Sequence, residues 1–267
     1  MHWQEVGDRV FTRHFDFLDQ QIGVVLGGDD VLVVDTRSTP AHAREVASDL
    51  LELTRNPISI VVDTHWHWDH AFGNNAFRPA TTWGHLRTAE RLRSEGEARR
   101  AEVVEALPDL AEDLLAVVID PPNRTFTDRA TVLVGDRAVE LAFHGRAHTD
   151  ADISVFVQDA AVLFAGDLIE NGAPPSFGDG YPIARPSAVE QLLPLATGAV
   201  VPGHGAVGDR AFVESQLAAF RGLADLSRKV HDGSLDIEAA LAGSPFGPHT
   251  PRDAFERALA ELGGELA

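Results

Sequence analysis

Apolar residues in the first third of the chain gather in short runs, rich in β-branched residues, that are typical of strands. Two such runs occupy residues 6–15 and 21–36, and a Gly-Gly-Asp-Asp segment within the second predicts a hairpin turn. The helical spacing of apolar positions over residues 40–54 predicts a helix after Thr39-Pro40. Residues 58–63 show no polar alternation, which predicts a strand buried on both faces.

The rest of the chain alternates between helical and strand patterns. Residues 85–115 predict helices broken near Pro108, and residues 186–195 predict a short helix. Further strands are predicted at residues 130–134, 138–143, 153–158, 161–167 and 199–202, and the pattern is helical again from residue 209. This order favours a mixed α/β architecture with two sheets packed face to face and helices outside. We expect one domain over residues 1–267, with residues 209–267 as a C-terminal helical extension.

Composition and charge narrow the classes of function. The 267 residues contain no cysteine, which excludes disulfides, thiolate zinc sites and a cysteine nucleophile. A formal net charge of -19 disfavours nucleic acid as a partner. The sequence has neither a secretory signal pattern nor an apolar run of membrane-spanning length, so we expect a cytoplasmic protein without membrane contact. Apolar faces in the C-terminal helices could pair, which leaves a homo-oligomer open.

Histidines and aspartates recur directly after the predicted buried strands. The segment THWHWDH, at residues 64–70, places three histidines and one aspartate within six residues of each other. Seven residues share a position at a strand end: His65, His67, Asp69, His70, His148, Asp167 and His204. Strand ends are rigid and can converge at one edge of a sheet, as a metal site with several ligands requires.

Imidazole nitrogen and carboxylate oxygen are ligands that zinc accepts readily. Seven ligands are too many for one tetrahedral ion, and they suit two ions with one carboxylate between them. Alternate residues of HxHxDH point the same way, so His65 and His67 can bind one ion while Asp69 and His70 turn toward the second.

Three other polar residues near these positions are considered. His144 is a rival of His148, but we favour His148 because it stands in a predicted turn, AHTDAD, and His144 follows a strand. Asp63 and Thr64 directly precede His65 and could orient the imidazoles through hydrogen bonds.

The motifs THWHWDH, AHTDAD, FAGD and VPGHG together resemble, in order and approximate spacing, those of the metallo-β-lactamase-fold hydrolases. The bridging aspartate makes the chain most similar to the glyoxalase II-like branch. The resemblance implies a four-layer αββα sandwich with the metal site at one edge of the two sheets. It also implies the ligand sets: His65, His67 and His148 for the first metal, Asp69, His70 and His204 for the second, and Asp167 bridging them.

The resemblance implies a dinuclear zinc hydrolase that cleaves an ester, thioester, lactone or lactam of a small molecule with a metal-bridging hydroxide. Asp69 would be catalytic, because it would orient that hydroxide as well as bind metal. Two alternatives remain. A mononuclear iron dioxygenase of the persulfide type shares HxHxDH and would hold one Fe²⁺, and a weak, promiscuous β-lactamase is the other. Efficient β-lactam hydrolysis is not expected, because GDLIENG offers no lysine for the substrate carboxylate.

Substrate contacts are expected from less regular parts of the chain. Residues 171–186 are rich in glycine and proline and predict a long loop beside the metals, which could form a wall of the pocket. Within it, Tyr181 and Phe177 are candidate substrate contacts, and Trp66 is a third candidate from the variable positions of HxHxDH. The helices over residues 85–115 could form a lid over the site.

Overall fold

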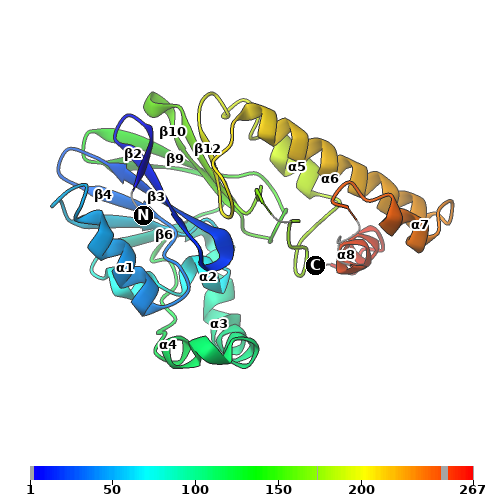
Figure 1. Ribbon diagram of the computed structural model, residues 1–267, viewed down its shortest axis with the longest axis horizontal. Coiled ribbons are helices and arrows are strands. Elements are labelled where there is room, and N and C mark those ends of the chain that lie inside the picture. The colour runs from blue at the N-terminus through cyan, green and yellow to red at the C-terminus, as the bar shows by residue number, and fades with distance from the viewer. Residues whose placement is uncertain (1–2, 173, 248–251, 267) are drawn as a thin grey trace.

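The computed structural model describes residues 3–172, 174–247 and 252–266, whose strands form two sheets packed face to face (Figure 1). The first sheet has the order β1 (Gln4–Gly7), β2 (Val10–Phe15), β3 (Gln20–Leu26), β4 (Val31–Val34), β5 (Ile58–Val62), β6 (Thr81–His85) and β7 (Arg124–Phe126). The second has the order β12 (Val200–Pro202), β11 (Val162–Gly166), β10 (Ile153–Val157), β9 (Arg137–Phe143) and β8 (Arg129–Val134).

Helices lie on the outer faces of both sheets, so the predicted αββα sandwich is confirmed. The α-helices are α1 (Pro40–Leu50), α2 (Trp68–Ala71), α3 (Leu86–Ala106), α4 (Ala111–Leu115), α5 (Arg185–Glu190), α6 (Arg210–His231), α7 (Ile237–Ala242) and α8 (Arg252–Leu262). Short 3₁₀ helices are η1 (Phe17–Asp19), η2 (Asn74–Phe77), η3 (Pro108–Leu110) and η4 (Gln158–Ala160). None of the helices in the described ranges is long and apolar enough to cross a membrane.

The uninterrupted apolar runs form strands whose side chains pack in different apolar clusters on the two faces of the sheet. Val62 of β5 and Phe164 of β11 point between the sheets, where they join one apolar cluster. Their neighbours face outward: Val61 packs in the cluster that includes α1, and Leu163 packs in the cluster that includes α6. The absence of polar alternation in residues 58–63 therefore has the predicted cause, since alternate residues enter alternate cores.

Parallel strands bring the predicted ligand segments to the same edge of the sandwich. Strand β4 pairs in parallel with β5, with α1 as the crossover between them, and β11 pairs in parallel with β12. The segments that follow β5, β11 and β12 leave the sheets at their carboxyl ends. The site described below is built on those segments.

Two predicted helices are shorter than expected, and a third is broken as expected. The helix predicted over residues 40–54 ends at Leu50 and continues as a turn. The helix predicted at 186–195 is α5 (Arg185–Glu190), which begins one residue earlier and ends five residues sooner. In the 85–115 segment, α3 ends at Ala106 and η3 begins at Pro108, because proline cannot donate a backbone hydrogen bond within a helix.

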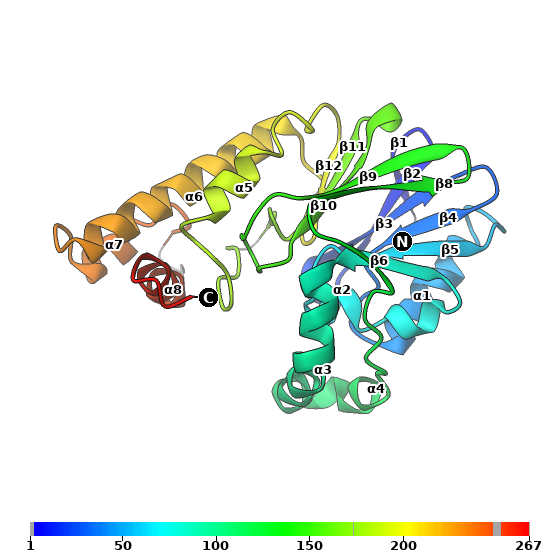
Figure 2. The same ribbon diagram turned by 180° about the vertical axis from the view of Figure 1, so that it is seen from behind.

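The C-terminal helices extend together away from the sheets (Figure 2). Their apolar residues are nevertheless continuous with the sandwich, because Phe220 of α6 and Phe255 of α8 belong to the same buried cluster as Leu163 and Ala165 of β11. The C-terminal helices and the second sheet therefore share one apolar core.

Candidate metal centre

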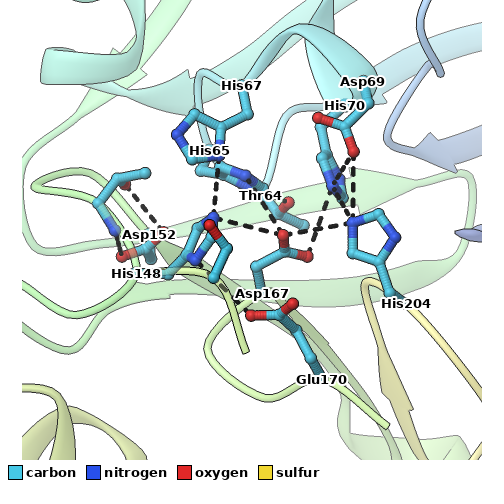
Figure 3. Close-up of polar contacts among 12 residues, drawn as sticks. Thr64, His65, His67, Asp69, His70, His148, Asp152, Asp167, Glu170 and His204 are labelled. Atoms are coloured by element: carbon cyan, nitrogen blue, oxygen red, sulfur yellow. Dashed lines mark hydrogen bonds and ion pairs between the residues drawn. The ribbon is translucent and has the colours of Figure 1, made fainter. Parts of the chain in front are cut away.

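All seven predicted ligands converge at the edge where β5, β11 and β12 end (Figure 3). They form two groups, each with ligand atoms within 4.8 Å of one another: His65, His67, His148 and Asp167, and separately Asp69, His70 and His204. The first two histidines leave β5 directly, and Asp69 and His70 lie on the single turn of α2. Sequence segments more than 130 residues apart therefore build one site, since His70 and His204 are 134 residues apart.

In the first group, three imidazole rings face one carboxylate. Nδ1 of His67 lies 2.9 Å from Nε2 of His148. Oδ2 of Asp167 lies 3.4 Å from Nε2 of His148 and 3.8 Å from Nε2 of His65. His65, His148 and Asp167 are buried, and the side chain of His67 is 15% exposed.

The second group surrounds a pair of facing imidazoles. Nε2 of His70 lies 3.1 Å from Nε2 of His204, and Oδ2 of Asp69 lies 3.3 Å from both nitrogens. Oδ1 of Asp167 is 3.4 Å from Nε2 of His70, and its Oδ2 is 3.3 Å from Nε2 of His204. Asp167 thus contacts both groups, as a bridging ligand must.

Hydrogen bonds on the far side of the rings fix which nitrogen faces inward. Nδ1 of His70 donates to Oδ2 of Asp35 at 2.8 Å, and Nδ1 of His204 donates to the carbonyl oxygen of Leu18 at 2.8 Å. Nδ1 of His65 donates to Oγ1 of Thr64 at 3.1 Å, and that hydroxyl donates in turn to Asp35 at 2.9 Å. The inward nitrogens of neutral rings are consequently unprotonated acceptors, the form that binds a metal ion.

Of the remaining two histidines, only His67 has a carboxylate partner among the described residues on the far side of its ring: its Nε2 lies 3.0 Å from Oδ2 of Asp179. Nδ1 of His148 has no hydrogen-bond partner within the described ranges and lies 3.7 Å from Oε1 of Glu170. The turn that carries His148 is closed by Asp152, whose carboxylate accepts hydrogen bonds from the amide and hydroxyl of Thr149.

Two glycines allow the close approach of the segments that carry Asp167 and His204. A Cβ atom on Gly203 would overlap Oδ1 of Asp167, and Gly166 adopts a φ of 51° against the side chain of Thr64. Arg185, whose side chain is fully buried, donates to the carbonyl oxygens of Asp167, Leu168 and Ser176 and so fixes the segment after β11.

The donor set fits divalent metal ions. Nε2 of His65 and Oδ1 of Asp167 are buried and have no hydrogen-bond partner within the described ranges. The facing nitrogens of His67 and His148 lie 2.9 Å apart and those of His70 and His204 lie 3.1 Å apart, so a proton or a metal cation must lie between the two lone pairs of each pair. Two cations, one in each group, would satisfy all of these atoms.

Charge in the site favours cations at the second group in particular. Burial opposes the charged form of His204, but the carboxylates of Asp167 and Asp69 outweigh it and raise its pKa to about 11. Burial lowers the pKa of His148 to about 3 and also lowers that of His65, so both rings stay neutral. The carboxylates of Asp69 and Asp167 therefore favour a proton or a metal ion at His204, in the second group.

The structure separates the other three polar candidates. Thr64 contacts the site, whereas the carboxylate of Asp63 accepts from Asn74 at 2.7 Å and, within the described residues, makes no hydrogen bond to a predicted ligand histidine. Nε2 of His144 pairs with Oγ of Ser154 at 2.7 Å, outside both groups. The preference for His148 over His144 agrees with this geometry, and Asp35 is the orienting carboxylate that the sequence interpretation missed.

An open cavity of about 620 Å³ lies over the two groups. Its wall includes Asn171, Ser176, Gly178 and Asp179, so the 171–186 loop lies where it was predicted, and α3 contributes Arg99. Leu18 and Trp68 provide apolar surface.

The three aromatic substrate candidates do not line this cavity. Phe177 is 1% exposed and packs against Phe220 in the helical core. Trp66 is 3% exposed and packs in the cluster that includes α3, and Tyr181 is 5% exposed between Arg146 and Arg257. Each ring is buried by packing, so Trp68 takes the position at the cavity that the sequence interpretation gave to Trp66.

Comparison with known proteins agrees with the fold. The family model of the metallo-beta-lactamase superfamily matches residues 16–227. A metallo-beta-lactamase type 2 of Bacillus cereus is 31% identical over 84 residues, which cover 30% of this chain and 33% of that protein, a third of its length. A metallo-beta-lactamase from Pontibacter korlensis has a TM-score of 0.67 at 19% identity, covering 82% of this chain and 98% of that one. The DIM-1 metallo-beta-lactamase has a TM-score of 0.65 at 18% identity, covering 82% and 96%.

Proposed function

The chain belongs to the metallo-beta-lactamase superfamily, and on that premise we propose that it is a hydrolase dependent on two zinc ions. The observation that carries the proposal is the position of Asp167, which contacts both groups of inward-facing imidazoles. His65, His67 and His148 would hold one ion, Asp69, His70 and His204 would hold the other, and Asp167 would bridge them. The glyoxalase II-like branch remains a prediction.

Zinc ions bound there would activate water as a nucleophile near neutral pH and polarise the bond to be cleaved. Asp69 lies at the cavity wall beside both His70 and His204. We assign Asp69 the role of orienting the attacking water and holding its proton. No serine or cysteine nucleophile is needed, and the sequence contains no cysteine.

The proposed substrate is a small molecule with an ester, thioester, lactone or lactam bond. A cavity of about 620 Å³ is in the range that accommodates small molecules. Leu18 and Trp68 offer an apolar surface to the substrate. Among the described residues that line the cavity, Arg99 is the one arginine or lysine.

The mononuclear iron dioxygenase is the competing hypothesis, and it leaves the second metal position unused. Here the second group is as well supported as the first: Asp35 holds His70, and the Leu18 carbonyl holds His204. The carboxylates of Asp69 and Asp167 also lie beside both of these rings and favour positive charge between them, which supports a second ion over an unused position.

Elemental analysis of protein purified without added metal tests the proposal directly. The same sample is assayed with nitrocefin and with a panel of thioesters, esters and lactones. We expect two zinc ions per chain and turnover of one of these bond types. Asp167→Asn should lose both the second ion and the activity, while Asp136→Asn on an exposed turn serves as the matched control. One iron ion per chain without hydrolysis would overturn the proposal in favour of the dioxygenase.

A further inference from the structure

Asp179, which is not itself one of the predicted ligands, contacts the far side of the His67 ring in the first group. Both oxygens of its carboxylate lie near Nε2 of His67, at 3.1 and 3.0 Å, while Nδ1 of the same ring faces His148 at 2.9 Å. A proton on Nε2 therefore points at Asp179, and the lone pair on Nδ1 points into the group. Asp179 belongs to the 171–186 loop and is separated from His67 by 112 residues.

The loop does not hold Asp179 in place by itself. Arg257, on the C-terminal helix α8, donates through Nη2 to the carbonyl oxygen of Asp179 at 3.0 Å and through Nε to that of Gly180 at 3.1 Å. One turn later, Glu261 accepts from the amides of Ile183 and Ala184 at 2.7 and 3.0 Å. Two side chains of α8 thus fix the loop on both sides of Tyr181.

Helix α8 is itself anchored in the core. Ala254, Phe255 and Ala258 are fully buried, and α8 packs against the long helix α6 (Figure 2). Arg257 also lies over the ring of Tyr181, 5.8 Å from its centroid. A continuous path of contacts therefore leads from the helical core through α8 and the loop to the imidazole of His67.

We infer that Asp179 is a positioning residue for His67, and that helix α8 holds it there through Arg257 and Glu261. This inference rests on the proposed function, because it assigns Asp179 a role in metal binding by His67. A carboxylate that accepts from the far nitrogen of a ligand histidine fixes the tautomer and the ring plane, and it makes the other nitrogen a stronger donor to metal. The C-terminal helices thus take part in building the metal centre.

Metal affinity of the full-length chain tests the role of Asp179. Zinc binding is measured by competition with a chelator, in the wild type and in a His204→Ala background that leaves the three-histidine group as the intact group. Asp179→Ala should weaken zinc binding in that background about 10–100-fold, the usual effect of removing such a partner. Asp179→Asn retains an acceptor oxygen and should recover part of the loss. Unfolding midpoints verify that every variant is folded.

The role of α8 is tested by substitutions on that helix. Arg257→Ala should weaken zinc binding in the same direction as Asp179→Ala. Arg252→Ala, on the same helix but paired with Glu238 at the surface, should leave zinc binding unchanged. If α8 acts through Asp179, Arg257→Ala should add no further loss in the Asp179→Ala variant, since residues that act through one contact are not additive.

The outcomes separate the two proposals. A wild-type chain that binds no divalent metal would overturn the proposed function and this inference with it. Normal zinc binding by the wild type with unchanged affinity in Asp179→Ala would overturn the role of Asp179 alone. Equal affinities in Arg257→Ala and Arg252→Ala, or full additivity of Arg257→Ala with Asp179→Ala, would overturn the role of α8.

Discussion

Oδ2 of Asp35 lies 2.8 Å from Nδ1 of His70, although the two residues are separated by 35 positions in the sequence. The same oxygen accepts from the hydroxyl of Thr64, and Oδ1 accepts from the Thr64 amide at 2.8 Å. Through Thr64 the carboxylate also supports His65 in the other group. One buried aspartate directly after β4 therefore orients predicted ligands of both groups.

Asp35→Ala should weaken zinc binding and lower activity about 10–100-fold, because His70 and Thr64 lose their common acceptor. Asp35→Asn should have a smaller effect, since asparagine retains one acceptor oxygen and tolerates the φ of 65° found at this position. Chelator competition and steady-state rates measure both variants. Equal affinities in the wild type and the alanine variant would show that His70 needs no external support.

Removal of metal should abolish activity, and rebinding should release protons. In the metal-free chain the nearby carboxylates hold the pKa of His204 at about 11, so Nε2 carries a proton at pH 7.5. A zinc ion must displace that proton, since only the unprotonated nitrogen is a ligand. An indicator dye in weak buffer should record the release, and His204→Ala should release fewer protons. Zinc binding without proton release would contradict this arrangement.

Gly203→Ala should impair the metal site without requiring any change in a ligand residue. Its Cβ would overlap Oδ1 of Asp167 and come within 3.0 Å of the Gly166 carbonyl carbon, so the bridging carboxylate must move. We expect loss of at least one zinc ion and of activity, measured by elemental analysis and turnover. Gly28→Ala is the matched control, because its Cβ would meet only Asp136 at 3.7 Å. Full zinc content in Gly203→Ala would show that β11 and β12 can separate.

Acid should destabilise the protein partly through His144. Burial lowers the pKa of this imidazole to about 4, whereas the unfolded chain takes up the proton near pH 6.5. Between these values the unfolded state binds more protons, so stability is full above about pH 6.5 and falls as the pH falls toward about 4. The two pKa values correspond to about 3 kcal/mol. Urea unfolding of His144→Gln should show a shallower loss over this window, and an unchanged slope would exclude the contribution of His144.

The sequence by itself determined the layers and the seven candidate ligands, because both depend on local patterns. Unbroken apolar runs predict strands buried on two faces, as Val61 and Val62 of β5 now are. HxHxDH is compact, so the turn after β5 and the single turn of α2 bring its four side chains to the same edge of the sheet through local geometry. The predicted preference for His148 over His144 also followed from position relative to a strand.

Only the tertiary structure decided which residues orient the ligands and which face the cavity. Trp66 and Trp68 are equivalent in the motif, yet packing beside α3 buries Trp66 and leaves Trp68 at the cavity. Phe177 and Tyr181 share a loop with Asp179, but their rings pack inward while the carboxylate reaches His67. Asp35 and Asp179 meet their histidines across 35 and 112 residues. Such contacts depend on how distant segments pack together. The local pattern of apolar and polar residues carries no information about which distant segments meet.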